Sequence, residues 1–141
     1  MGITIREALA RDLAGLAKQF DLYRQFYEQS PDLERATAFL TQRFERRESV
    51  ILVASDATGT LCGFCQLYPS FCSVEASPIY TLYDLFVQPA ARQGGVGRLL
   101  LAAAAERAAT DGKSRMDLTT AKTNHAAQAL YESMGWQRDE V

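Results

Sequence analysis

Three glycines and two arginines occupy one short segment of this chain, RQGGVGRL at residues 92–99. The apolar run LFV at residues 85–87 precedes it, and a leucine- and alanine-rich run typical of a helix follows it. The order strand, glycine-rich turn, helix leaves backbone N–H groups free at the positive end of a helix dipole. Such a place binds phosphate oxygens, and glycine lets a ligand approach the backbone closely. The segment therefore predicts a phosphate-bearing ligand, with an ordinary turn and helix start as the structural alternative.

Two familiar glycine-rich motifs do not fit this segment. The lysine and hydroxyl residue of a P-loop, GxxxxGK[ST], are absent. A Rossmann fingerprint follows the first strand of a βαβ unit, whereas the spacing here is RxxGxG and the segment lies late in the chain. A protein that uses this loop to bind a nucleotide with its metal ion would need a lysine or a magnesium-binding carboxylate near the loop, and none is evident.

A second segment, NHAAQALYESMGW at residues 124–136, has the pattern of a short amphipathic helix. Asn124 is well suited to cap its N-terminus, and Gly135 is suited to end it. The apolar side chains that recur at helical spacing and share one face are Ala127, Leu130, Tyr131 and Met134.

With these two segments the chain resembles the GCN5-related N-acetyltransferase (GNAT) superfamily. The matching motifs are DLFVQP at residues 84–89, RxxGxG at residues 92–97 and NxxAxxLYxxxGW at residues 124–136. Two ordered motifs at the expected separation are far more specific than either alone. The DLFV strand and an aromatic first helix look like the subgroup of diamine and small histone-acetyltransferase-like proteins.

The resemblance implies that an acetyl group moves from acetyl-CoA, the cosubstrate, to a primary amine by direct attack in a ternary complex, without a metal. The pyrophosphate would rest on the glycine loop, and the pantetheine arm would pair with the strand before it. An N–H near Phe86 or Val87 would polarise the thioester carbonyl. The residues expected to bind the cosubstrate are Leu85, Phe86, Val87, Arg92, Gln93, Gly94, Gly95, Val96, Gly97, Arg98, Asn124 and Tyr131.

Two residues are candidates for proton transfer. Tyr131 matches the family tyrosine that protonates the leaving thiolate, and a phenol with a pKa of about 10 can donate at neutral pH. Packing within the last helix is the alternative role. Asp84 is a charge in an apolar strand, where it can act as the base, bind the substrate ammonium or support the structure. Glu75 is a weaker candidate for the base, and a water relay would need no unique base.

The amine acceptor is less well defined. Tyr23 and Tyr27 lie four residues apart on an aromatic helix, where with Asp84 they can line a substrate pocket or simply pack on the sheet. The loop near residues 70–78 is expected to contribute to acceptor specificity. The subgroup resemblance suggests a small polyamine or a lysine side chain, while aminoglycosides and amino acids stay open. A non-catalytic acyl-CoA-binding or sensor domain on the same fold is the alternative function.

These residues must be positioned by a single domain, residues 1–141, of the α/β (α+β) class. Hydrophobic spacing and turn residues predict the order β-α-α-β-β-β-α-β-α. This is the GNAT arrangement, a mixed and mostly antiparallel sheet with helices on both faces. The expected strands are 3–6, 50–54, 61–68, 81–87 and 115–120, and the expected helices are 13–27, 33–44, 99–106 and 124–134.

GNAT proteins usually continue through one or two more strands after the Gly-aromatic pair, but only residues 137–141 follow here. The last strand is therefore expected to be short, missing or supplied by a neighbouring subunit. An unpaired sheet edge tends to associate with another chain, so a homodimer is expected.

Composition limits the remaining possibilities. With 141 residues and a net charge of −2, the chain is long enough for a core and has no basic patch for nucleic acid. No apolar run approaches the ~20 residues of a transmembrane helix, and no signal peptide is evident, so a cytoplasmic protein is expected. Cys62, Cys65 and Cys72 are expected to be buried or half-buried thiols. Residues i and i+3 of a strand point to opposite faces, so Cys62 and Cys65 would not pair, and His125, the single histidine, cannot form a metal cluster alone.

Overall fold

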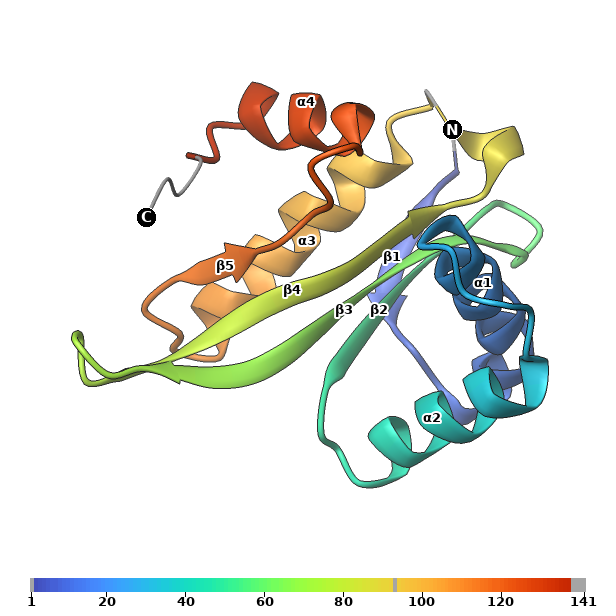
Figure 1. Ribbon diagram of the computed structural model, residues 1–141, viewed down its shortest axis with the longest axis horizontal. Helices are drawn as coiled ribbons and strands as arrows, with labels where there is room; N and C mark the ends of the chain where they lie inside the picture. Colours follow the sequence, from blue (N-terminus) through green and yellow to red (C-terminus); the bar gives the residue numbers. More distant parts are fainter. Residues whose placement is uncertain (1, 93, 138–141) are drawn as a thin grey trace.

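The computed structural model describes residues 2–92 and 94–137 (Figure 1). The elements follow the expected order and are β1 (Thr4–Glu7), α1 (Leu13–Phe26), α2 (Leu33–Glu45), β2 (Val50–Ser55), β3 (Leu61–Cys72), β4 (Ser77–Val87), α3 (Val96–Thr110), β5 (Met116–Leu118) and α4 (His125–Ser133). Short 3-10 turns at Ala10–Asp12 and Pro89–Ala91 precede α1 and the glycine loop.

The described strands form one sheet in the order β1-β2-β3-β4-β5. Every pair is antiparallel except β4 and β5, which run parallel. Helices α1 and α2 cover one face of the sheet, and α3 and α4 cover the other (Figure 1). The predicted fold class, a mixed and mostly antiparallel sheet between two helical layers, is confirmed.

Each face of the sheet has its own hydrophobic core. On the α1/α2 face, Leu16 and Phe20 of α1 and Leu40 of α2 pack against Val53 and Phe64 of the sheet. On the α3/α4 face, α3 and α4 pack against the opposite side of the same strands. The residues of this core include Leu100, Leu101, Ala104, Tyr131, Leu67 and Leu82. The α1/α2 face contains the side chains that matter most for the site.

A β-bulge in β4 decides which way Asp84 points. Gln66 pairs with Asp84 but Leu67 pairs with Leu82, so Tyr83 is an extra residue on β4. Residues two apart on a regular strand share a face, and a bulge breaks that alternation. Leu82 accordingly packs on the α3/α4 face, whereas beyond the bulge Phe86 packs on the α1/α2 face. Asp84, two residues before Phe86, is turned to the α1/α2 face with it.

A second bulge corrects one prediction about the cysteines. Ala54 pairs with Gly63 and Ser55 with Leu61, which leaves Cys62 as the extra residue. Cys62 and Cys65 therefore pack in the same core, on the α3/α4 face, and the expectation that they point to opposite faces is wrong. All three cysteines are free thiols, buried at the first two positions and half-buried at Cys72, as expected.

Two segments differ in length from the sequence prediction. The β3–β4 hairpin continues to Cys72 and Ser77, so most of the expected 70–78 loop is strand, and the turn covers residues 73–76. Strand β5 has three residues and pairs with β4 only at residues 80–82. Among the described helices, none combines the length and hydrophobicity needed to cross a membrane.

Candidate active site

Strand β4 has an open edge over its last five residues. Within the described part of the chain, β5 pairs with β4 only as far as Leu82, and no strand follows it on that side. The N–H of Gln88 donates to Cys62 on β3, so by alternation Phe86 also turns its backbone groups to β3. The backbone groups of Leu85 and Val87 therefore face the open edge. Leu85, Phe86 and Val87 were all expected to contact a ligand at this edge. The structure places the backbone groups of the first and third there, but not those of Phe86.

The glycine loop leads from this edge into helix α3. Gly95 precedes the first helical residue and has a φ of 82°. Residues other than glycine adopt this left-handed backbone conformation only at a cost in free energy. Gly95 has no side chain to cap the helix, and the first intrahelical bond is that from Leu99 N–H to Gly95. The N–H groups of the first turn of α3 thus have no intrahelical acceptor. Gln93, which the sequence assigned to the same site, lies outside the described residues.

The two arginines of the loop make contacts within the protein. Arg92 donates from Nε to the carbonyl of Val87 at 2.9 Å, and Arg98 donates to Ser133 Oγ of α4 at 2.9 Å. A Cβ on Gly97 would come within 3.1 Å of Leu130 Cδ2, so this glycine also permits close packing of α3 and α4. Arg92 and Arg98 therefore join the two ends of the loop to β4 and to α4.

Helix α4 begins and ends as predicted. Asn124 accepts the N–H of Ala127 at 3.2 Å, which confirms the N-cap, and Gly135 follows the helix with a φ of 92°. Tyr131 faces inward and is 6% exposed. Burial, and then the proximity of Tyr27 and Cys65, raise the pKa of its phenol to about 12, so Tyr131 is protonated at neutral pH and can donate a proton.

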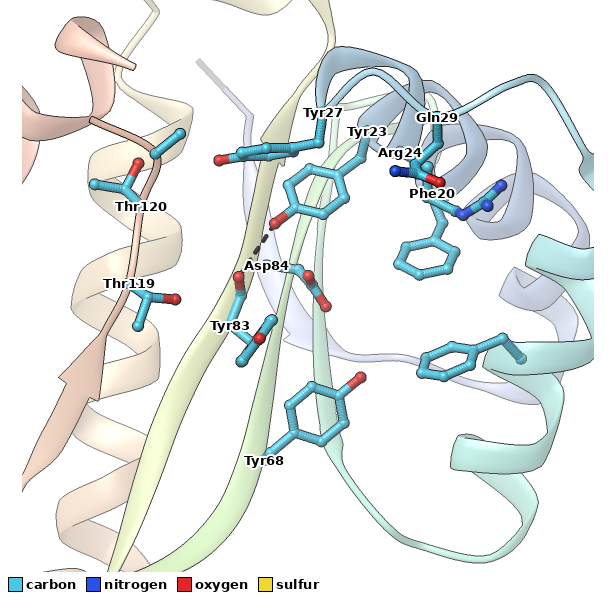
Figure 2. Close-up of a pocket in the computed structure, with 12 residues that line it drawn as sticks. Phe20, Tyr23, Arg24, Tyr27, Gln29, Tyr68, Tyr83, Asp84, Thr119 and Thr120 are labelled. Atoms are coloured by element: carbon cyan, nitrogen blue, oxygen red, sulfur yellow. Dashed lines mark hydrogen bonds between the residues drawn. The ribbon is translucent and has the colours of Figure 1, made fainter. Parts of the chain in front are cut away.

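Asp84 lies at the base of a cleft of about 540 Å³ on the α1/α2 face (Figure 2). The residue is 5% exposed, and its Oδ2 accepts from Gln66 Nε2 at 2.7 Å. Ser49 Oγ donates to Gln66 Oε1 at 2.8 Å, which orients the amide so that its NH₂ faces Asp84. Burial raises the pKa of the Asp84 carboxyl, and the bond from Gln66 opposes part of that rise.

The structure brings the three predicted substrate residues together. Tyr23, Tyr27 and Asp84 line the same cleft, with the two tyrosines on the α1 side of the carboxylate (Figure 2). The hydroxyl of Tyr23 donates to the carbonyl of the bulge residue Tyr83 at 3.1 Å. Burial, and then the negative charge of Asp84, raise the pKa of Tyr23. The opposite wall is formed by Thr119 and Thr120, just after β5.

Tyr131 does not line this cleft. It borders a second cleft of about 870 Å³ between β5 and α4, together with His125. The charge of an ionised Tyr27 contributes to the raised pKa of Tyr131, and that of an ionised Tyr131 contributes to the raised pKa of Tyr23. Tyr131 belongs to the core on the α3/α4 face, whereas Asp84 is turned to the α1/α2 face.

Several residues of the cleft were missed by the sequence analysis. Phe39 from α2, Tyr68 from β3 and Tyr83 from the bulge contribute aromatic walls, and Gln66 holds the carboxylate. A polar Gln66 within an apolar strand was the one visible signal. The 70–78 segment does not line the cleft, contrary to expectation, and Glu75 pairs with Arg115 at 3.2 Å in the hairpin region.

Comparisons with known proteins agree with this architecture. A family model described as the acetyltransferase (GNAT) family matches residues 16–136, so the chain belongs to that family. A relative from Bacillus subtilis (strain 168), the uncharacterized N-acetyltransferase YhfO, is 46% identical over 137 residues, which cover 97% of this chain and 91% of the relative. The protein is therefore an acetyltransferase.

Solved structures show the same fold. The crystal structure of a probable acetyltransferase has a TM-score of 0.91 at 38% identity and covers 97% of this chain and 91% of its own. An aminoglycoside N-acetyltransferase in complex with CoA has a TM-score of 0.85 at 20% identity, with 99% and 90% covered. These likenesses do not identify the subgroup, which stays a prediction.

Proposed function

We propose that the protein transfers the acetyl group of acetyl-CoA to a primary amine. The observation that carries this proposal is the placement of Asp84, a buried carboxylate beside the open edge of β4, with the protonated Tyr131 on the opposite face of the sheet. A base and an acid on the two faces of the sheet, beside a strand edge that no described strand covers, can act on an amine and a thioester that meet there.

The residues present fit acetyl-CoA as the cosubstrate. The first N–H groups of α3, beside a glycine with no capping side chain, suit the pyrophosphate. The backbone of Leu85 and the N–H of Val87 suit the amides of the pantetheine arm, while the carbonyl of Val87 already accepts from Arg92. An N–H of this edge suits the carbonyl oxygen of the thioester. An aminoglycoside acetyltransferase with this fold is known in complex with CoA, which supports the proposal.

The proton steps balance as follows. Asp84 takes one proton from the bound ammonium and passes it to water, which leaves a neutral amine able to attack. When the C–N bond has formed, Asp84 takes the second proton from that nitrogen and then releases it to water, which restores the carboxylate. As the C–S bond breaks, Tyr131 gives its proton to the sulfur and recovers one from solvent. The net products are an amide, a thiol and one released proton.

The first experiment is a calorimetric titration with acetyl-CoA, followed by thiol release with a panel of amines. We expect micromolar binding and turnover with at least one amine. Tyr131→Phe should reduce kcat by about 100-fold or more and leave acetyl-CoA affinity nearly unchanged, because it removes the acidic hydroxyl and keeps the ring that would contact the cosubstrate. Tyr80→Phe is the matched control, a buried tyrosine whose hydroxyl contacts Asp111.

The outcomes separate the candidate functions. Binding without thiol release for every amine would favour the sensor alternative. No binding would mean that the glycine loop is structural. Equal kcat in Tyr131→Phe and Tyr80→Phe would assign Tyr131 to packing. The expected homodimer and cytoplasmic location are separate predictions, and light scattering of the purified protein tests the first.

A further inference from the structure

Aromatic side chains dominate the walls of the cleft above Asp84. They come from α1, α2, β3 and β4 and are Phe20, Tyr23, Tyr27, Phe39, Tyr68 and Tyr83. Several are held against one another: Phe20 stacks on Phe39 at 5.6 Å between centroids, and Tyr23 meets Tyr27 edge to face at 5.1 Å. Such walls suit a ligand with an apolar body, and aromatic rings also attract a cationic group on that ligand.

Charged groups around the cleft are few. Among its described lining residues, Asp84 is the one acid and Arg24 the one base. Arg24 is paired with Asp21 at 3.4 Å, and that carboxylate also accepts from Gln25 and from the N–H of Asp32. At the rim, Arg43 lies over the ring of Phe39 and pairs with Glu48 at 2.8 Å. The cleft thus offers one carboxylate at its base and no second acid along its walls.

The carboxylate at the base has no cationic partner among the described residues. A buried charge without an opposite charge is costly, and an ammonium that arrives beside it removes much of that cost. A second ammonium on the same ligand would lie against aromatic and hydroxyl groups and near two guanidinium groups. It would lose water without gaining a carboxylate.

We propose that the acceptor is a small monoamine, with a single ammonium on an aromatic or bulky hydrocarbon body. This inference rests on the proposed acetyl transfer and narrows its substrate class. It selects against polyamines, one of the two acceptor types suggested by the family resemblance. The ammonium contacts Asp84, and the body fills the space between the α1 tyrosines, Phe39 and Tyr68.

Matched amines test this directly. Butylamine and 1,4-diaminobutane have the same carbon chain and differ by the second ammonium, while phenethylamine adds a ring to a short chain. We expect kcat/KM for the diamine to be ~10-fold or more below that for butylamine, because the extra ammonium loses water and gains no carboxylate in return. Phenethylamine should exceed butylamine by ~10-fold or more through burial of its ring.

One variant should change the selectivity in a defined direction. Gln29 lines the cleft, and Gln29→Glu adds a carboxylate there with almost no change in shape. We expect this variant to raise the diamine-to-butylamine ratio of kcat/KM by about threefold to tenfold. Gln42→Glu, on the exposed surface of α2 and outside the cleft, adds the same charge and should leave the ratio unchanged.

The results distinguish this proposal from the underlying function. Absence of acetyl-CoA binding and of thiol release with every amine would overturn the acetyl transfer itself. Turnover that favours 1,4-diaminobutane or spermidine over butylamine and phenethylamine would overturn the monoamine proposal alone. So would turnover confined to a lysine-containing peptide. An equal change of ratio in Gln29→Glu and Gln42→Glu would show that the cleft does not hold the acceptor.

Discussion

Two of the three buried aspartates among the described residues, Asp12 and Asp84, lie in different regions of the molecule and have opposite surroundings. Asp12 in the turn before α1 is 7% exposed, and Asp84 at the β4 bulge is 5% exposed. Arg6 donates to both oxygens of Asp12, at 2.7 and 3.0 Å, and the N–H of Leu9 donates at 2.7 Å. These bonds lower the pKa of Asp12, whereas burial raises the pKa of Asp84. Both side chains are nearly inaccessible to solvent, but Asp84 lies deeper in the protein and has no arginine beside it, so the two carboxyls have pKa shifts of opposite sign.

The location of each aspartate explains the difference. Asp12 closes a turn between β1 and α1, where a paired charge joins two elements of the fold. Asp84 stands where β4 loses its neighbour on one side and where a cleft begins. A carboxylate that lacks a cation in the free protein is suited to receive one from a ligand, and its raised pKa suits a base.

The largest expected effect is on activity, in Asp84→Asn. Removing the base should lower kcat/KM by at least about 100-fold. The asparagine oxygen can still accept from Gln66, and a buried charge is removed, so the free energy of unfolding at neutral pH should not fall. Amine turnover and urea unfolding of the same preparation measure both quantities. A variant that loses activity only because it unfolds would contradict the assigned role.

The opposite result is expected for Asp12→Asn. The change breaks the two bonds from Arg6 in their charged form and should lower the free energy of unfolding by about 1 to 3 kcal/mol. The sign follows from the lowered pKa: the stabilisation is present above the ordinary pKa of 3.8 and is lost as the pH falls below it. The folded fraction should keep nearly its full kcat/KM. A loss of kcat/KM comparable to that of Asp84→Asn would remove the distinction between the two regions.

Local signals in the sequence predicted much of the fold. Helix ends are signalled by a few neighbouring residues, and three of them are found as expected. They are the N-cap at Asn124, the end of α4 at Gly135 and the glycine before α3. Asp32 likewise caps α2, by accepting from the N–H of Arg35. Helix spacing also placed Tyr131 on the inner face of α4.

Features that depend on strand pairing could not be predicted in the same way. Each bulge, at Cys62 and at Tyr83, shifts the strand alternation by one residue, and nothing local in the sequence marks either position. The chain of bonds from Ser49 through Gln66 to Asp84 joins three segments through the register of β3 and β4. Asp84 was identifiable as an unusual charge, but its partners and its cleft required the sheet.

The smallest expected effect is on the pH dependence of kcat/KM, which tests the hydrogen bonds from Ser49 through Gln66 to Asp84. The base must be ionised, so activity falls as the pH drops through the raised pKa of Asp84. Tyr131, with a pKa of about 12, stays protonated over the range of interest. Tyr23 and Tyr68 line the same cleft as the carboxylate, and Cys65 lies on the opposite face of the sheet. All three have raised pKa values, so they stay neutral over this range.

Ser49→Ala frees the amide of Gln66 to rotate and weakens its donation to Asp84. The pKa of Asp84 should then rise further, and the acid limb of kcat/KM should move to higher pH, by no more than the ~1 kcal/mol of one hydrogen bond. Gln66→Leu should move the limb further in the same direction. Ser70→Ala, an exposed serine of β3, is the control and should leave the limb in place. A limb that is identical in all three variants would mean that the amide of Gln66 does not set the ionisation of Asp84.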